Sequence, residues 1–130
     1  MIPKTLFSKT PWWAFVLDLV LVTAFVLIGR RTHDETDAVT GILTTWWPFL
    51  SGLIIGWLSL IGVRWPFVTI WSGAVVVVAT VFVGMLLRVS SGQGVALSFV
   101  IVATVVLAVF LIGWRFLAIL LVKRRAARAA

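Results

Sequence analysis

Apolar residues fill four long stretches of this chain, and short polar stretches separate them. The apolar stretches cover residues 12–29, 42–63, 67–87 and 95–122. A helix needs about 20 apolar residues to cross a hydrocarbon core of about 30 Å; the last three stretches reach this length, and the first nearly does. Valine-rich segments such as residues 75–78 are also predicted as helix, because a lone strand cannot cross lipid with its backbone unpaired. The pattern therefore predicts an all-α membrane protein with four transmembrane helices in an antiparallel up-down bundle.

The first apolar stretch resembles a secretory signal peptide in length only. Asp18 interrupts its middle, it has no small-x-small cleavage site, and Arg30 and Arg31 follow it directly. We therefore interpret residues 12–29 as a membrane helix. The whole chain, residues 1–130, is expected to form a single four-helix transmembrane domain.

The lysines and arginines between the apolar stretches predict the orientation. With both termini in the cytoplasm, the inner side holds seven of them: Lys4, Lys9, Arg64, Lys123, Arg124, Arg125 and Arg128. The outer side then holds three: Arg30, Arg31 and Arg88. Because cytoplasmic loops carry the excess of basic residues, this distribution predicts a multi-pass protein of the plasma (inner) membrane with both termini cytoplasmic.

The composition supports a membrane protein. Hydrophobic residues make up 62% of the 130 residues and charged residues 12%, with a mean hydropathy of +1.19, whereas soluble domains are about half apolar and about a quarter charged. The net charge of +7 does not indicate a nucleic-acid partner, because the basic residues lie between and after apolar stretches. The chain has no cysteine, which excludes disulfides, thiolate chemistry and cysteine-based metal sites.

Two ionic residues fall inside the predicted helices. Asp18 lies five residues after Trp13, about 8 Å from the cytoplasmic interface, and Arg115 lies eight residues before Lys123, about 12 Å from the same interface. A charge within lipid needs a partner or water, so their similar depth predicts an ion pair between Asp18 and Arg115. Two alternatives are that Arg115 extends to the headgroups alone and that Asp18 serves as a proton or cation site.

Small residues recur on one face of each of two predicted helices. Gly52 and Gly56 form a G-x-x-x-G pair, and Gly73 and Gly84 share a face of the next helix. Small residues let helices approach closely in lipid, so these faces are predicted to pack on other helices.

Basic and polar residues gather at the predicted outer end of the helices. They are Arg30, Arg31, His33, Arg88 and Gln93, and if they converge they form a binding site for an anionic solute or a lipid headgroup. The alternative is ordinary charge at helix ends. The adjacent residues His33, Asp34 and Glu35 are more typical of a solvated loop than of a metal site, so no metal is expected.

The eight tryptophans are interpreted mainly as an interfacial belt rather than an aromatic ligand cage, since Trp12, Trp13, Trp46, Trp47 and Trp65 lie at the ends of apolar stretches. The sequence shows no nucleophile with a base, no carboxylate pair and no nucleotide-binding loop. We therefore expect no enzymatic activity and no cofactor.

Several short motifs make the chain resemble a family of small four-helix membrane proteins of actinobacteria and haloarchaea, classified as a domain of unknown function. The motifs are Asp18, G-R-R-x-H at 29–33, W-P-F at 47–49 with Gly52, Gly56 and Trp57, G-M-L-L-R at 84–88, G-Q-G at 92–94 with Ser98 and Phe99, and G-W-R at 113–115. The resemblance implies a four-helix membrane protein, and it includes the polar residues of the outer end.

Two functions remain open from the sequence. The first is a homo-oligomeric transport-type, channel-type or solute- or lipid-binding protein, with a pathway between subunits and Arg30, Arg31, Arg88 and Gln93 at its outer mouth. The second is a structural or accessory subunit whose glycine faces dock on a larger membrane complex.

Overall fold

The structure, a computed structural model, describes residues 12–31, 38–64 and 66–129. These residues form four helices: α1 (Trp12–Arg31), α2 (Ala38–Gly62), α3 (Ile70–Ser90) and α4 (Leu97–Ala129). Each helix is long and apolar enough to cross a membrane. The prediction of an all-α chain with four apolar helices is confirmed.

Two helices extend well beyond their predicted ends. α2 begins at Ala38 instead of residue 42, and α4 continues to Ala129 instead of ending at residue 122. Hydropathy marks where a segment becomes apolar, whereas a helix continues for as long as its residues favour helical backbone hydrogen bonding. The added part of α4 is rich in alanine and arginine, which favour helix, and basic side chains also suit the negative end of the helix dipole.

α3 begins later than predicted, because a polar cap fixes its start. The Thr69 hydroxyl accepts a hydrogen bond from the backbone N–H of Ser72, and the Ser72 hydroxyl accepts one from the backbone N–H of Thr69. This reciprocal capping box satisfies two amides that the helix leaves unpaired. Residues 67–69, predicted to be the first turn of the helix, instead form the connection that precedes it.

The early start of α2 also places Pro48 inside the helix. There it removes the hydrogen bond that residue 48 would donate to the carbonyl of Thr44.

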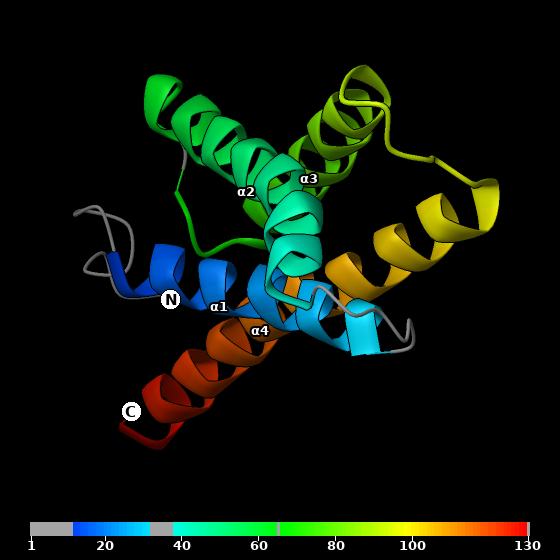
Figure 1. The fold of residues 1–130 in the computed structure, drawn as a ribbon. Coiled ribbons are helices and arrows are strands. Elements are labelled where there is room, and N and C mark those ends of the chain that lie inside the picture. Colours follow the sequence, from blue (N-terminus) through cyan, green and yellow to red (C-terminus); the bar gives the residue numbers. More distant parts are fainter. Residues whose placement is uncertain (1–11, 32–37, 65, 130) are drawn as a thin grey trace.

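The helices contact one another at two levels. At one level the rings of Phe25 (α1), Phe49 (α2) and Phe99 (α4) pack edge to face, with centroids 5.3 and 6.1 Å from that of Phe49. At the other level Trp57 of α2 packs edge to face on Phe15 of α1. Figure 1 shows the first turn of α1 and the last turns of α4 on the same side of the molecule.

The glycine faces lie against other helices of the same chain. A Cβ atom on Gly52 would lie 2.7 Å from the Cα atom of Thr80 in α3, so α2 and α3 approach within backbone contact there. Gly56 lies against Val76 and Ala79, Gly84 against the ring of Phe49, and Gly73 against Arg115 and Ile112 of α4. Close helix packing therefore requires small residues at these positions.

Candidate functional site

The Asp18 carboxylate lies at the centre of a buried polar cluster. Arg115 donates two hydrogen bonds to it, from Nη1 to Oδ1 at 2.9 Å and from Nη2 to Oδ2 at 2.7 Å. The indole N–H of Trp57 donates to Oδ2 at 2.8 Å, and that of Trp114 donates to Oδ1 at 2.7 Å. Each carboxylate oxygen thus accepts two bonds, and Asp18 and Arg115 are both 0% exposed.

The Arg115 guanidinium also binds backbone carbonyl groups. Its Nε donates to the carbonyl of Phe67 at 2.8 Å, in the connection between α2 and α3, and its Nη1 donates to the carbonyl of Leu111 at 2.9 Å. Gly73 of α3 leaves room for the arginine side chain, since a Cβ atom there would lie 3.0 Å from Arg115 Cδ. The cluster therefore joins α1, α2 and α4 to the start of α3.

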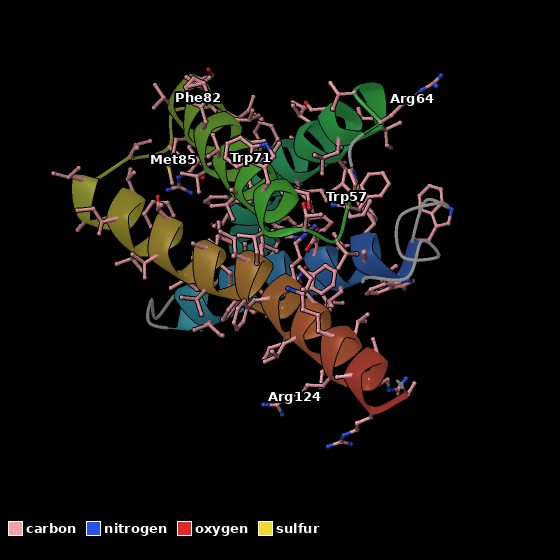
Figure 2. All side chains as sticks on the ribbon, turned by 180° about the vertical axis from the view of Figure 1, so that it is seen from behind. Trp57, Arg64, Trp71, Phe82, Met85 and Arg124 are labelled. Atoms are coloured by element: carbon pink, nitrogen blue, oxygen red, sulfur yellow. The ribbon has the colours of Figure 1, made fainter. Side chains whose placement is uncertain are left out.

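The chemistry of this cluster is that of a structural ion pair that holds the helices together. The carboxylate is saturated with donors, and the bidentate arginine pair has the geometry of the strongest charge-assisted hydrogen bonds. The four hydrogen bonds that the two oxygens accept all come from side chains of the same chain. Figure 2 labels Trp57, which is 3% exposed and is one of the two tryptophan donors.

The sequence interpretation missed the two tryptophan donors. It assigned most tryptophans to an interfacial belt, which fits exposed residues such as Trp12 and Trp71, 71% and 63% exposed. The available signal was depth: Trp57 lies six residues inside its apolar stretch, about 9 Å from the end and so at a depth similar to that of Asp18, and Trp114 precedes the buried arginine. A tryptophan remote from the interface needs a partner for its N–H group.

Arg88 and Gln93 meet in the connection between α3 and α4. Arg88 Nη1 donates to Gln93 Oε1 at 2.9 Å, and its Nε and Nη2 donate to the carbonyl of Gly94 at 3.2 and 2.9 Å. The guanidinium also lies over the ring of Phe99, 4.6 Å from its centroid. These contacts fix the orientation of the positive charge.

Gln93 links this connection to the proline of α2. Its Nε2 donates to the backbone carbonyl of Thr44 at 3.0 Å. That carbonyl is four residues before Pro48, so it is the acceptor that the proline leaves without its helical donor. The glutamine side chain therefore replaces the missing helix bond, and Arg88 holds the glutamine in place.

A groove of about 660 Å³ runs between α1 and α4 beside Arg88. Its walls are mainly apolar, with Phe25 and Ile28 from α1 and Phe99 and Val102 from α4. Polar atoms reach it from Arg88 and from the hydroxyl residues Thr45 and Ser98. This arrangement places one cation beside apolar walls.

The remaining residues predicted for the outer site are only partly located. Arg30 and Arg31 form the last residues of α1, and His33, together with Asp34 and Glu35, lies outside the described residues. Of the five predicted residues, the structure brings together Arg88 and Gln93. Among residues 12–31, 38–64 and 66–129 no group of three or more potential metal ligands is found.

The described residues form an all-α protein with four helices that are long and apolar enough to cross a membrane. Residues 15–118 match the family described as "Protein of unknown function (DUF3054)", and the chain is a member of that family. The match covers both ions of the buried pair and both residues of the Arg88–Gln93 contact. No curated protein and no solved structure gives a significant match to the chain.

Proposed function

We propose that this protein is a homo-oligomeric, transport- or binding-type protein of the plasma membrane that takes an amphiphilic anion into the groove between α1 and α4. The observation that carries the proposal is the position of Arg88, a cation of fixed orientation beside mainly apolar walls. An anionic head would lie near Arg88, and an apolar tail would lie along Phe25 and Val102. A solute and a lipid headgroup share this chemistry.

The proposed topology is an antiparallel up-down bundle with both termini in the cytoplasm. The contacts of Phe25 with Phe49 and of Asp18 with Trp57 support the antiparallel order of α1 and α2. Seven basic residues against three support the orientation. Since the chain lacks cysteine, single cysteines at Ser90 and Ala127 can test it: an impermeant maleimide should label Ser90→Cys on intact cells, and Ala127→Cys only after permeabilisation. The reverse pattern would refute the orientation.

Ligand binding can be tested by thermal unfolding of the purified chain in an uncharged detergent. A ligand that binds only the folded state raises the unfolding free energy by about 2.7 kcal/mol at 100 times its dissociation constant. Short-chain phosphatidylglycerol should raise the unfolding midpoint, and phosphatidylcholine of equal chain length should not. If inorganic phosphate acts as strongly as phosphatidylglycerol, the ligand is a small anion and not a lipid.

Variants connect this effect to Arg88. Arg88→Gln should reduce the shift caused by phosphatidylglycerol, whereas Arg88→Lys, which keeps the charge, should retain part of it. Lys123→Gln is the matched control, because it removes a positive charge at the other end of the bundle that does not line this groove. A shift that is equal in Arg88→Gln and wild type, or equal for both lipids, would contradict the proposal.

We propose a homo-oligomer because the buried charges of one chain bind each other and so do not line a pathway within that chain. Asp18 and Arg115 bind each other, so a pathway for a solute fits better between copies than within one chain. The alternative, an accessory subunit that docks through its glycine faces, loses support because Gly52, Gly56 and Gly84 contact helices of the same chain. The mass of the protein in mild detergent tests this point: a dimer or larger assembly is expected, and a monomer that co-purifies with other chains would favour the accessory subunit.

A further inference from the structure

A second groove, of about 490 Å³, lies at the carboxyl end of α4, against the start of α1. Its apolar walls include Trp13 of α1 and Leu121 and Val122 of α4. Its rim is formed by three arginines of the same helix: Arg124, Arg125 and Arg128. The groove thus combines an apolar floor with a concentrated positive charge.

The length of α4 places this rim at the membrane surface. The 33 residues of the helix span about 50 Å, whereas a hydrocarbon core is about 30 Å thick. Arg124 lies nine residues beyond the buried Arg115, which is about 14 Å along the axis. Figure 2 shows Arg124 projecting away from the bundle near the end of the helix.

Trp13 marks the boundary between the apolar floor and the surface. Its ring packs edge to face on Trp114, with the centroids 5.5 Å apart, and it remains 49% exposed. Tryptophan prefers the level of the lipid headgroups. The contact with Trp114 therefore holds an interfacial side chain in a fixed position beside the arginines.

The chain supplies no side-chain carboxylate to balance these arginines. The sequence has no Asp or Glu after residue 37, and Asp18 is bound to Arg115. The other three acids, at residues 34, 35 and 37, belong to the connection that follows the opposite end of α1. These arginines therefore leave a net positive charge at the end of α4, beyond what the helix dipole offsets, which an anion from outside the chain can balance.

We infer that this groove binds an anionic phospholipid of the leaflet that surrounds it. Arg124 and Arg128 are four residues apart and so lie on one face of the helix, where both can reach a single phosphate. The guanidinium fork matches phosphate oxygens, and basic pockets at the ends of membrane helices are typical headgroup sites. An acyl chain lies along Trp13 and Leu121. This site is separate from the Arg88 groove, because it lies at the other end of the bundle.

Native mass spectrometry of the full chain in mild detergent tests this inference, with phosphatidylglycerol and phosphatidylcholine of the same acyl chains in equal amounts. Wild type should retain phosphatidylglycerol preferentially. Arg124→Gln/Arg128→Gln should weaken that retention by about tenfold or more, as expected from the loss of two headgroup contacts. Trp13→Ala should weaken the retention of phosphatidylglycerol, because it removes the ring along which the acyl chain lies. Trp13→Phe should preserve that retention.

Lys123→Gln is the matched control, because Lys123 belongs to the same helical turn and does not line the groove. It should leave the preference unchanged. Equal losses in Lys123→Gln and Arg124→Gln would mean a diffuse basic surface and would overturn the site. So would equal retention of the two lipids, or displacement of phosphatidylglycerol by inorganic phosphate at the same concentration.

Arg88→Gln separates this inference from the proposed function. If retention falls in the Arg124→Gln/Arg128→Gln variant and persists in Arg88→Gln, the site at α4 is supported. If it falls only in Arg88→Gln, the α4 site is refuted and the groove beside Arg88 is supported. A loss in neither variant would refute both.

Discussion

Arg115 and Asp18 meet through two hydrogen bonds of 2.9 and 2.7 Å, in a position where both side chains are completely buried. Their elements are distant in sequence, since 97 residues separate the two. Withdrawing two charges from water is unfavourable, and their attraction offsets this only when the remaining donors and acceptors are also satisfied. Trp57, Trp114 and the carbonyls of Phe67 and Leu111 meet that condition.

Removing either ion should destabilise the bundle strongly, and removing the second should add less than removing the first. We expect Asp18→Asn and Arg115→Gln to lower the unfolding free energy by about 3–5 kcal/mol each, because each leaves an uncompensated or unsatisfied buried group. The double variant should lose clearly less than the sum. Unfolding in mixed micelles with an increasing fraction of denaturing detergent measures the unfolding free energy of the two single variants and of the double variant. Losses that add, or single losses below about 1 kcal/mol, would show that the pair contributes little.

Trp57 and Trp114 should each stabilise the folded protein through the hydrogen bond that the indole N–H donates to Asp18. Trp57→Phe and Trp114→Phe keep an aromatic ring and remove one bond to the carboxylate, which is worth about 1.5–3 kcal/mol for a charged acceptor. Trp71→Phe is the control, because Trp71 is 63% exposed and its replacement should change the stability by less than about 0.5 kcal/mol. Equal effects at the three positions would contradict the role given to the N–H groups.

The contact between α2 and α3 should tolerate no side chain at Gly52. A methyl group there would meet backbone atoms of Ala79 and Thr80 at 2.7–2.8 Å, and such overpacking typically costs about 1–3 kcal/mol. Gly62→Ala is the matched control at the end of the same helix, where a Cβ atom would meet nothing within 4 Å. We expect the same unfolding assay to show destabilisation in Gly52→Ala and no loss in Gly62→Ala. The opposite order would mean that the helices can separate at little cost.

The sequence could predict how deep each residue of the site lies along its helix. The pairing of Asp18 with Arg115 was predicted in this way, because two opposite charges at a similar distance from one interface attract each other in lipid. The sequence did not identify the tryptophans, since the rotation of each helix about its axis determines which indole reaches the carboxylate. Helix ends were also uncertain: the capping box of Thr69 shortened α3, and the basic segment beyond Val122 continued α4.

The glycine positions were predictable for a related reason. A face of small residues indicates close packing whichever helix provides the partner. The sequence did not identify the partners, and so it left open the docking of Gly52 and Gly56 on another protein. The structure shows that α3 of the same chain occupies this face.

The last prediction concerns Gln93 and the proline of α2. Gln93 donates to the carbonyl of Thr44, which lacks its helical donor because residue 48 is proline. Gln93→Ala should therefore lower the unfolding free energy by about 1–2 kcal/mol in wild type, since a carbonyl in a membrane helix loses its partner. In a Pro48→Ala background the N–H of residue 48 serves Thr44, and Gln93→Ala should have little effect. Hydrogen exchange of the amides of α2 should show the same dependence: faster exchange after Gln93→Ala with Pro48 present, and unchanged exchange with Ala at that position. An equal effect of Gln93→Ala in both backgrounds would mean that the glutamine acts only through Arg88, and the link to the proline would be wrong.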